Sequence, residues 1–88
     1  MHRYWIEFGI GLEHEFGSLL LPGVGVTAMN RDDALQLIRR DVTRGHELPA
    51  VSNVVRDVDV STLDRGHVLP AVGDPSRRGV WFPRAFQR

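Results

Sequence analysis

Two histidines at equivalent positions of a repeated segment are the residues of this 88-residue chain with the clearest potential for chemistry. Residues 44–51 (Arg-Gly-His-Glu-Leu-Pro-Ala-Val) match residues 65–72 at seven of eight positions, so His46 and His67 share one local sequence. Two imidazoles in one place could bind a divalent metal ion or change charge between about pH 5 and pH 8. The repeat therefore raises the hypothesis of a metal or small-ligand site near both histidines.

Further ligands for such a site would have to be carboxylates. Asp57 and Asp59 are the candidates, because alternate residues of a strand point to the same face. The simpler interpretation of the repeat, which we favour, is one backbone solution used twice. It combines an arginine at a helical end, a glycine cap and an extended segment whose proline prevents further helix. On that interpretation the repeat binds no metal, and we expect none.

Other combinations of reactive residues form no recognised catalytic motif. In Glu13-His14-Glu15, neighbouring side chains of an extended chain point apart and cannot all face one ion. Gly23-Val24-Gly25 precedes a predicted helix but lacks the third glycine of a dinucleotide-binding loop and the Gly-Lys-Ser/Thr of a P-loop. The chain has no cysteine, and its serines stand in no nucleophile motif. An enzyme is therefore the least supported class, and no cofactor is expected.

The C-terminal segment, residues 77–88, combines four arginines with three aromatic residues and contains no acidic residue. Such a surface could dock onto an acidic protein partner, or it could stack single-stranded bases and neutralise their phosphates. A structural alternative is an edge strand whose aromatic residues enter the core while the arginines face solvent and deter edge pairing. The residues that we expect to contact a partner are Arg77, Arg78, Trp81, Arg84 and Phe86.

The composition favours a protein partner over nucleic acid. Eleven arginines balance eleven acidic residues, which argues against a surface devoted to nucleic acid or membrane. The absence of cysteine fits a reducing compartment. The N-terminal residues lack the apolar core of a signal peptide, and the longest aliphatic run, Leu19-Leu20-Leu21, is far shorter than a membrane span. We expect one domain over residues 1–88, located in the cytoplasm.

These candidate residues are arranged around one strongly marked helix between Asn30 and Gly45. Asn30 is a good N-cap, and Asp33 stands three residues later, where its carboxylate can reach back to the backbone of the cap. Arginines near the C-terminal end place positive charge at the negative end of the helix dipole, which is favourable. Gly45 can adopt the left-handed conformation that ends a helix. Apolar residues between these ends recur at three- and four-residue spacings, which predicts one stripe for a sheet to cover.

Strands are predicted on both sides of this helix. Alternating apolar residues predict a half-buried strand over Tyr4–Leu12. Phe16–Leu21 resumes an extended apolar pattern, which Pro22-Gly23 bends before residues 24–28, so that two strands precede the helix. The elements predicted after the helix are a strand over residues 51–60, a capped turn at Ser61–Asp64 and a strand over residues 79–82. The order β-β-α-β-short turn-β predicts an α+β domain with a small, mainly antiparallel sheet and one helix packed on one face. The second face carries Trp5, so a homodimer partner or a ligand could cover it.

Several segments resemble a group of small uncharacterised bacterial proteins. The resemblance rests on Gly25-Val26-Thr27-Ala28 with Asp33-Ala34-Leu35, Asp57-Val58-Asp59-Val60-Ser61-Thr62-Leu63-Asp64, His67-Val68-Leu69-Pro70 and Arg78-Gly79-Val80-Trp81-Phe82-Pro83. It implies a bacterial single-domain protein and brings no activity, cofactor or catalytic residue with it.

Together these observations predict a non-catalytic protein-interaction or regulatory module. Two alternatives stay open. One is nucleic-acid binding through the C-terminal arginines and aromatic residues, and the other is a metal or small-ligand site near His46 and His67.

Overall fold

The computed structural model describes residues 1–88 as a four-stranded antiparallel sheet with one substantial helix. The strand order is β3-β1-β2-β4, so that β3 and β4 form the two edges. The strands are β1 (His2–Phe8), β2 (Val24–Ala28), β3 (Val51–Arg56) and β4 (Gly79–Phe82). The helices are α1 (Gly17–Leu20), α2 (Arg31–Asp41) and the 3₁₀ turns η1 (Val60–Thr62), η2 (Leu69–Ala71) and η3 (Arg84–Phe86). The predicted α+β class and the predicted element order are confirmed.

The predicted N-cap Asn30 holds the start of α2, and Gly45 lies in the turn just beyond its end. Oδ1 of Asn30 accepts a hydrogen bond from the backbone N–H of Asp33 at 2.9 Å. The carboxylate of Asp33 reaches back to the N–H of Met29, also at 2.9 Å, one residue earlier than a standard capping box would place it. At the other end Gly45 has a φ of +90° and donates its N–H to the carbonyl of Arg39. The helix itself ends at Asp41, with Val42 as its C-cap, so Gly45 closes the turn that follows the helix.

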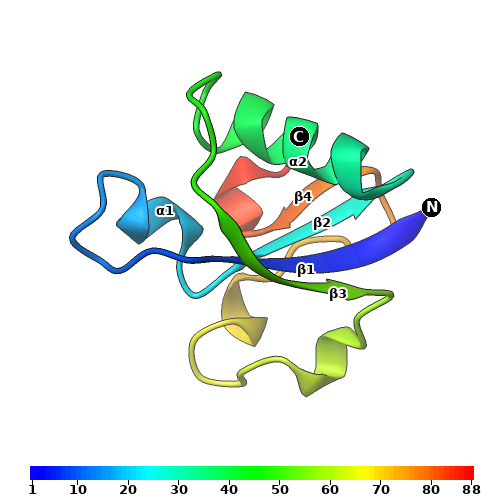
Figure 1. The fold of residues 1–88 in the computed structure, drawn as a ribbon. Helices are drawn as coiled ribbons and strands as arrows, with labels where there is room; N and C mark the ends of the chain where they lie inside the picture. Colours follow the sequence, from blue (N-terminus) through cyan, green and yellow to red (C-terminus); the bar gives the residue numbers. More distant parts are fainter.

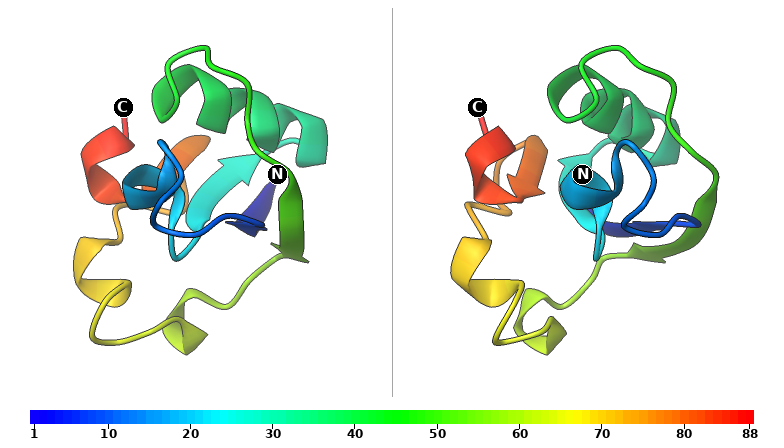
Figure 2. Two further views of the ribbon diagram at one scale, coloured as in Figure 1. Left: turned by 60° about the vertical axis from the view of Figure 1, so that its left-hand side comes forward. Right: turned by 90° about the vertical axis from the view of Figure 1, so that its left-hand side faces the viewer.

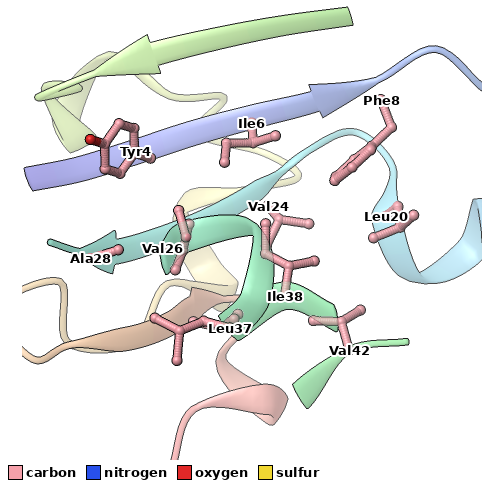
Figure 3. Close-up of a cluster of buried hydrophobic side chains, with 12 residues drawn as sticks. Tyr4, Ile6, Phe8, Leu20, Val24, Val26, Ala28, Leu37, Ile38 and Val42 are labelled. Carbon is pink, nitrogen blue, oxygen red and sulfur yellow. The ribbon is translucent and has the colours of Figure 1, made fainter. Parts of the chain in front are cut away.

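One face of the sheet and α2 enclose the larger hydrophobic core (Figure 3). Alternate residues of β1 point into it, and α2 contributes the apolar stripe that its sequence predicts. Its buried members are Tyr4, Ile6, Phe8, Leu20, Val24, Val26, Ala28, Ala34, Leu37, Ile38, Val42 and Val80. Burying these side chains is the main favourable term for folding in a domain of this size.

The second face of the sheet is covered by the chain itself. The segment from residue 57 to residue 72, with η1 and η2, lies on the side of the sheet opposite α2 (Figure 1, Figure 2). Val58 and Val68 of this segment are buried against Trp5, Trp81 and Phe82. The ring centroids of Trp5 and Phe82 lie 5.4 Å apart. Part of the face that could have been covered by a homodimer partner is therefore covered within one chain.

The strand prediction is wrong in three places. Residues 17–20 form the short helix α1 instead of an extended segment, because Phe16, Leu19 and Leu20 also fit a helical spacing. The first strand ends at Phe8 and not at Leu12. The third strand ends at Arg56 and not at Val60, since the next residue, Asp57, has a φ of +56° and turns the chain away from the sheet.

The two copies of the repeat adopt different conformations. In the first copy Gly45 has the predicted left-handed φ just beyond α2, although the C-cap is Val42, and the chain then runs extended into β3. In the second copy Gly66 has no left-handed φ, and residues 69–71 form η2. The interpretation as one backbone solution used twice is therefore wrong for residues 65–72. No helix of this structure combines the length and the apolar character needed to cross a membrane.

Candidate binding groove

A half-open groove of about 770 Å³ lies beside Trp5, on the side of the sheet that faces away from α2. Its walls come from four parts of the chain: strand β1, the loop before α1, the residues after α1, and the segment around η1 and η2. Half of the ten lining residues are hydrophobic. The lining consists of Trp5, Glu7, Leu12, Leu21, Pro22, Thr62, Leu63, Asp64, His67 and Val68.

The carboxylate of Glu7 is held in a fixed position at this groove. Its Oε2 accepts a hydrogen bond from the indole N–H of Trp5 at 3.3 Å, and its Oε1 accepts one from the amide of Asn53 at 3.2 Å. Because both oxygens are already oriented by the protein, a ligand would not have to order this side chain on binding. Glu7 thus presents a positioned negative charge next to an apolar surface.

A second carboxylate, that of Asp64, is fixed by the turn that follows η1. Its Oδ1 accepts hydrogen bonds from the backbone N–H groups of Gly66 and His67, at 2.7 and 2.9 Å. The imidazole Nδ1 of His67 lies 3.3 Å from the same oxygen. These contacts hold the pKa of Asp64 below its usual value, and the hydrogen bond from the backbone N–H of His67 is the largest cause. Asp64 is therefore ionised at neutral pH.

The ionisable side chains that line the groove are the carboxylates of Glu7 and Asp64 and the imidazole of His67. None of the eleven arginines of the chain lines it. Apolar walls with a few fixed polar groups are typical of a site that binds a partner or ligand, and two carboxylates favour a ligand that carries positive charge. The lining contains no cysteine or serine nucleophile, and its one carboxylate–imidazole pair, Asp64 with His67, contacts no such nucleophile.

The structure separates the two histidines of the repeat. His67 lines the groove, whereas His46 stacks on Phe16, with 5.7 Å between the ring centroids. The loop of residues 42–50 lies on the α2 side of the sheet, and the segment of η1 and η2 lies on the other side (Figure 1). The hypothesis of a site shared by His46 and His67 is therefore wrong.

The carboxylates considered as further ligands are also engaged elsewhere. Asp57 pairs with the imidazole of His2 at 3.0 Å. Asp59 caps η1 by accepting hydrogen bonds from the N–H and the hydroxyl of Ser61, at 3.0 and 2.7 Å. No three histidine, aspartate or glutamate side chains gather in a way that could hold a metal ion.

The predicted C-terminal contacts do not form one exposed surface. Trp81 is fully buried, with 0% of its surface exposed. The guanidinium of Arg78 pairs with the carboxylate of Asp33 near the start of α2, with Nε 3.1 Å from Oδ2. Arg77 donates a hydrogen bond to the carbonyl of Arg88. Three of the five predicted residues thus have structural contacts within the chain.

The other two predicted contacts lie in η3. Arg84 is exposed, and no hydrogen bond or ion pair within the chain engages its side chain. Phe86 is half-buried and packs against the core beneath α2. Of the predicted set, only Arg84 is fully available to a partner in this conformation.

The groove residues are absent from the predicted site because they are far apart in sequence. Leu12, Leu21 and Leu63 read as ordinary core or turn residues, and only the folded topology brings them together. One local signal was present, since Trp5 and Glu7 are two positions apart on a predicted strand and must share a face. No known protein family, no curated protein and no solved structure matches this chain.

Proposed function

We propose that this protein is a non-catalytic, cytoplasmic interaction module of a bacterium that binds a segment of a partner protein in the groove beside Trp5. The partner segment would insert an apolar side chain between the walls and place a lysine or arginine near Glu7 and Asp64. The observation that carries this proposal is the lining itself, which has apolar walls and two fixed carboxylates but no arginine. The bacterial origin rests on the resemblance described above, and the compartment rests on the absence of cysteine.

Charge complementarity supports a cationic occupant. Outside residues 31–44 and 77–88 the chain carries eight acidic residues and only three arginines. The groove lies in this acidic part of the molecule, so the field around it would attract a basic segment and repel an acidic one. Apolar contact would then supply most of the affinity, because exposed charge pairs contribute little by themselves.

Exposed Leu12 gives the proposal a specific anchor. Its side chain is 76% exposed and adds to the apolar surface that Trp5, Leu21 and Leu63 form at the groove. A bound segment would cover it. Substituting Leu12 should therefore weaken binding without a cost in stability, because the side chain makes few contacts in the free protein.

The proposal can be tested by selecting binders from a random peptide library on the full chain. We expect enriched peptides to combine an aromatic or aliphatic residue with a nearby lysine or arginine. Leu12→Ser should weaken the binding of a selected peptide by about tenfold, the loss of roughly one exposed apolar contact. Met29→Ser is the matched control, since Met29 is also exposed (61%) but does not line the groove. Enrichment of acidic peptides, or an equal loss in both variants, would contradict the proposal.

A further inference from the structure

Two arginine-rich segments that are distant in sequence lie together on the side of the sheet opposite the groove. Residues 31–44 contain α2 and its end, and residues 77–88 contain β4 and η3. Both η3 and the C-terminus lie beside α2 (Figure 1, Figure 2). The two segments hold eight arginines and three aspartates, a formal excess of five positive charges that the neutral total conceals.

A small notch forms where these segments meet. It has a volume of about 170 Å³ and is lined by Arg40, Asp41, Arg44, Ala85, Phe86, Gln87 and Arg88. Three arginines and one carboxylate thus line the notch. Asp41 lies beneath them, with only 2% of its side chain exposed.

Asp41 positions two of the three guanidinium groups. It accepts hydrogen bonds from Nε and Nη2 of Arg40, both at 2.8 Å, and its Oδ1 lies 3.0 Å from Nε of Arg88. The side chains of Arg40 and Arg88 are nevertheless 53% and 71% exposed. Their remaining N–H groups are not engaged by Asp41 and are accessible to solvent. The carboxylate therefore fixes these arginines without saturating them as donors.

Arg44 adds a third, unpaired charge. Its backbone has a φ of +53°, and no hydrogen bond or ion pair within the chain engages its side chain. Exposed Arg39 and Arg84 extend the positive surface beyond the notch. Several guanidinium groups with free donors, spread wider than one anion, match a row of phosphates better than a single small anion.

We propose that this arginine notch binds the backbone phosphates of a nucleic acid. The chemistry is phosphate contact without base stacking, because Trp81 and Phe82 are buried and Phe86, the one aromatic residue that lines the notch, is half-buried and packs against the core. Binding would therefore depend little on base sequence. The site is independent of the groove, which lies on the other side of the sheet, so either proposal can fail while the other holds.

The test is fluorescence anisotropy of a short labelled duplex DNA with the full chain. Binding should weaken roughly 40-fold between about 50 and 200 mM salt if three phosphates are contacted. Arg44→Gln should weaken binding and lower the salt slope by about one. Arg65→Gln is the matched control, because Arg65 is also exposed but belongs to the segment on the opposite side of the sheet. Thermal unfolding of both variants checks that each remains folded.

Three results would overturn the proposal. The first is an absence of binding at low salt, and the second is an equal loss in Arg44→Gln and Arg65→Gln. The third is displacement of the duplex by a competitor. Displacement by millimolar inorganic phosphate would assign the notch to a free anion. Displacement by a polyglutamate peptide, with the same dependence on Arg44, would assign it to an acidic protein. If Arg44→Gln fails to fold, Arg84→Gln probes the same positive surface with a residue that has no partner in the chain.

Discussion

The indole N–H of Trp5 donates a hydrogen bond to the carboxylate of Glu7, two positions further along the same strand, at 3.3 Å. The pleat of β1 places both side chains on the face opposite α2. One side chain supplies an apolar wall of the groove and the other supplies a fixed charge. The pair therefore combines, at one end of the groove, the two properties that a cationic and partly apolar segment would recognise.

Glu7→Gln tests the charge of this pair separately from its shape. The oxygen of glutamine can still accept the hydrogen bond from Trp5, and the exposed amide of Asn53 can rotate so that its oxygen accepts from the new NH2 group. We therefore expect the unfolding free energy to change by no more than about 0.5 kcal/mol. The affinity for a selected basic peptide should fall by about tenfold, because a charge-assisted hydrogen bond becomes a neutral one. Isothermal titration and urea unfolding measure the two quantities. An unchanged affinity would show that Glu7 does not contact the partner.

Gly25→Ala should destabilise the protein through direct overlap with Trp81. A Cβ atom at Gly25 would overlap the six-membered ring of Trp81, which is fully buried and has no room to move. We expect a loss of about 1–3 kcal/mol, equal to a fall in Tm of roughly 5–20 °C for a domain of this size. Gly9→Ala is the control, since its Cβ would meet the nearest atom at 3.7 Å, and its Tm should stay close to that of the native protein.

The fold could be predicted from local signals, but the candidate site could not. Asn30 and Gly45 mark the ends of α2 in the sequence, and the alternation along β1 is a local pattern, so both elements were predictable. Phe16–Leu21 was not, because a short apolar run fits a strand and a helix equally well. Trp81 was predicted as a contact although Gly25 makes room for its ring, and that pairing becomes visible only once β2 and β4 are known to be neighbours.

Arg78 and Arg84 should differ in stability although both were predicted as partner contacts. Arg78→Ala removes the ion pair with Asp33 and should lower the midpoint of urea unfolding slightly, because the pair is exposed to solvent. Arg84→Ala removes an exposed side chain without a partner and should stay within about 0.5 kcal/mol of the native protein. Urea unfolding of both variants makes the comparison. If Arg78→Ala weakened partner binding and left stability unchanged, the predicted C-terminal contact surface would regain support.

Asp33 should make stability sensitive to acid. The hydrogen bond from Arg78 is the largest cause that holds the pKa of Asp33 below the value of about 3.8 that it has in an unfolded chain, and the N–H of Met29 adds to it. The contribution of Asp33 to the unfolding free energy is therefore fully present above about pH 4–5. It is lost as the pH falls through the lower pKa that Asp33 has in the folded protein. Asp33→Asn should be less stable than the native protein at pH 7, and the difference should shrink below about pH 4. A difference that does not change with pH would mean that the pair contributes through packing alone.

The segment of residues 57–72 should open more readily than the sheet that it covers. Only Val58 and Val68 of this segment are buried, and its hydrogen bonds are mostly local, such as that from the N–H of Val68 to the carbonyl of Asp64. Few buried contacts and local hydrogen bonds give low protection against amide exchange. We therefore expect the amides of residues 60–72 to exchange faster than those of β1 and β2.

A bound partner segment should reverse this difference, because the same residues form one wall of the groove. Hydrogen exchange measured with and without a selected peptide should show slower exchange at Leu63, His67 and Val68 when the peptide is present, and no change in α2. Slower exchange confined to α2 and residues 84–88 would instead place the peptide on the arginine side of the sheet. That outcome would contradict the groove as the protein-binding site, because the protected residues would be those around the arginine notch.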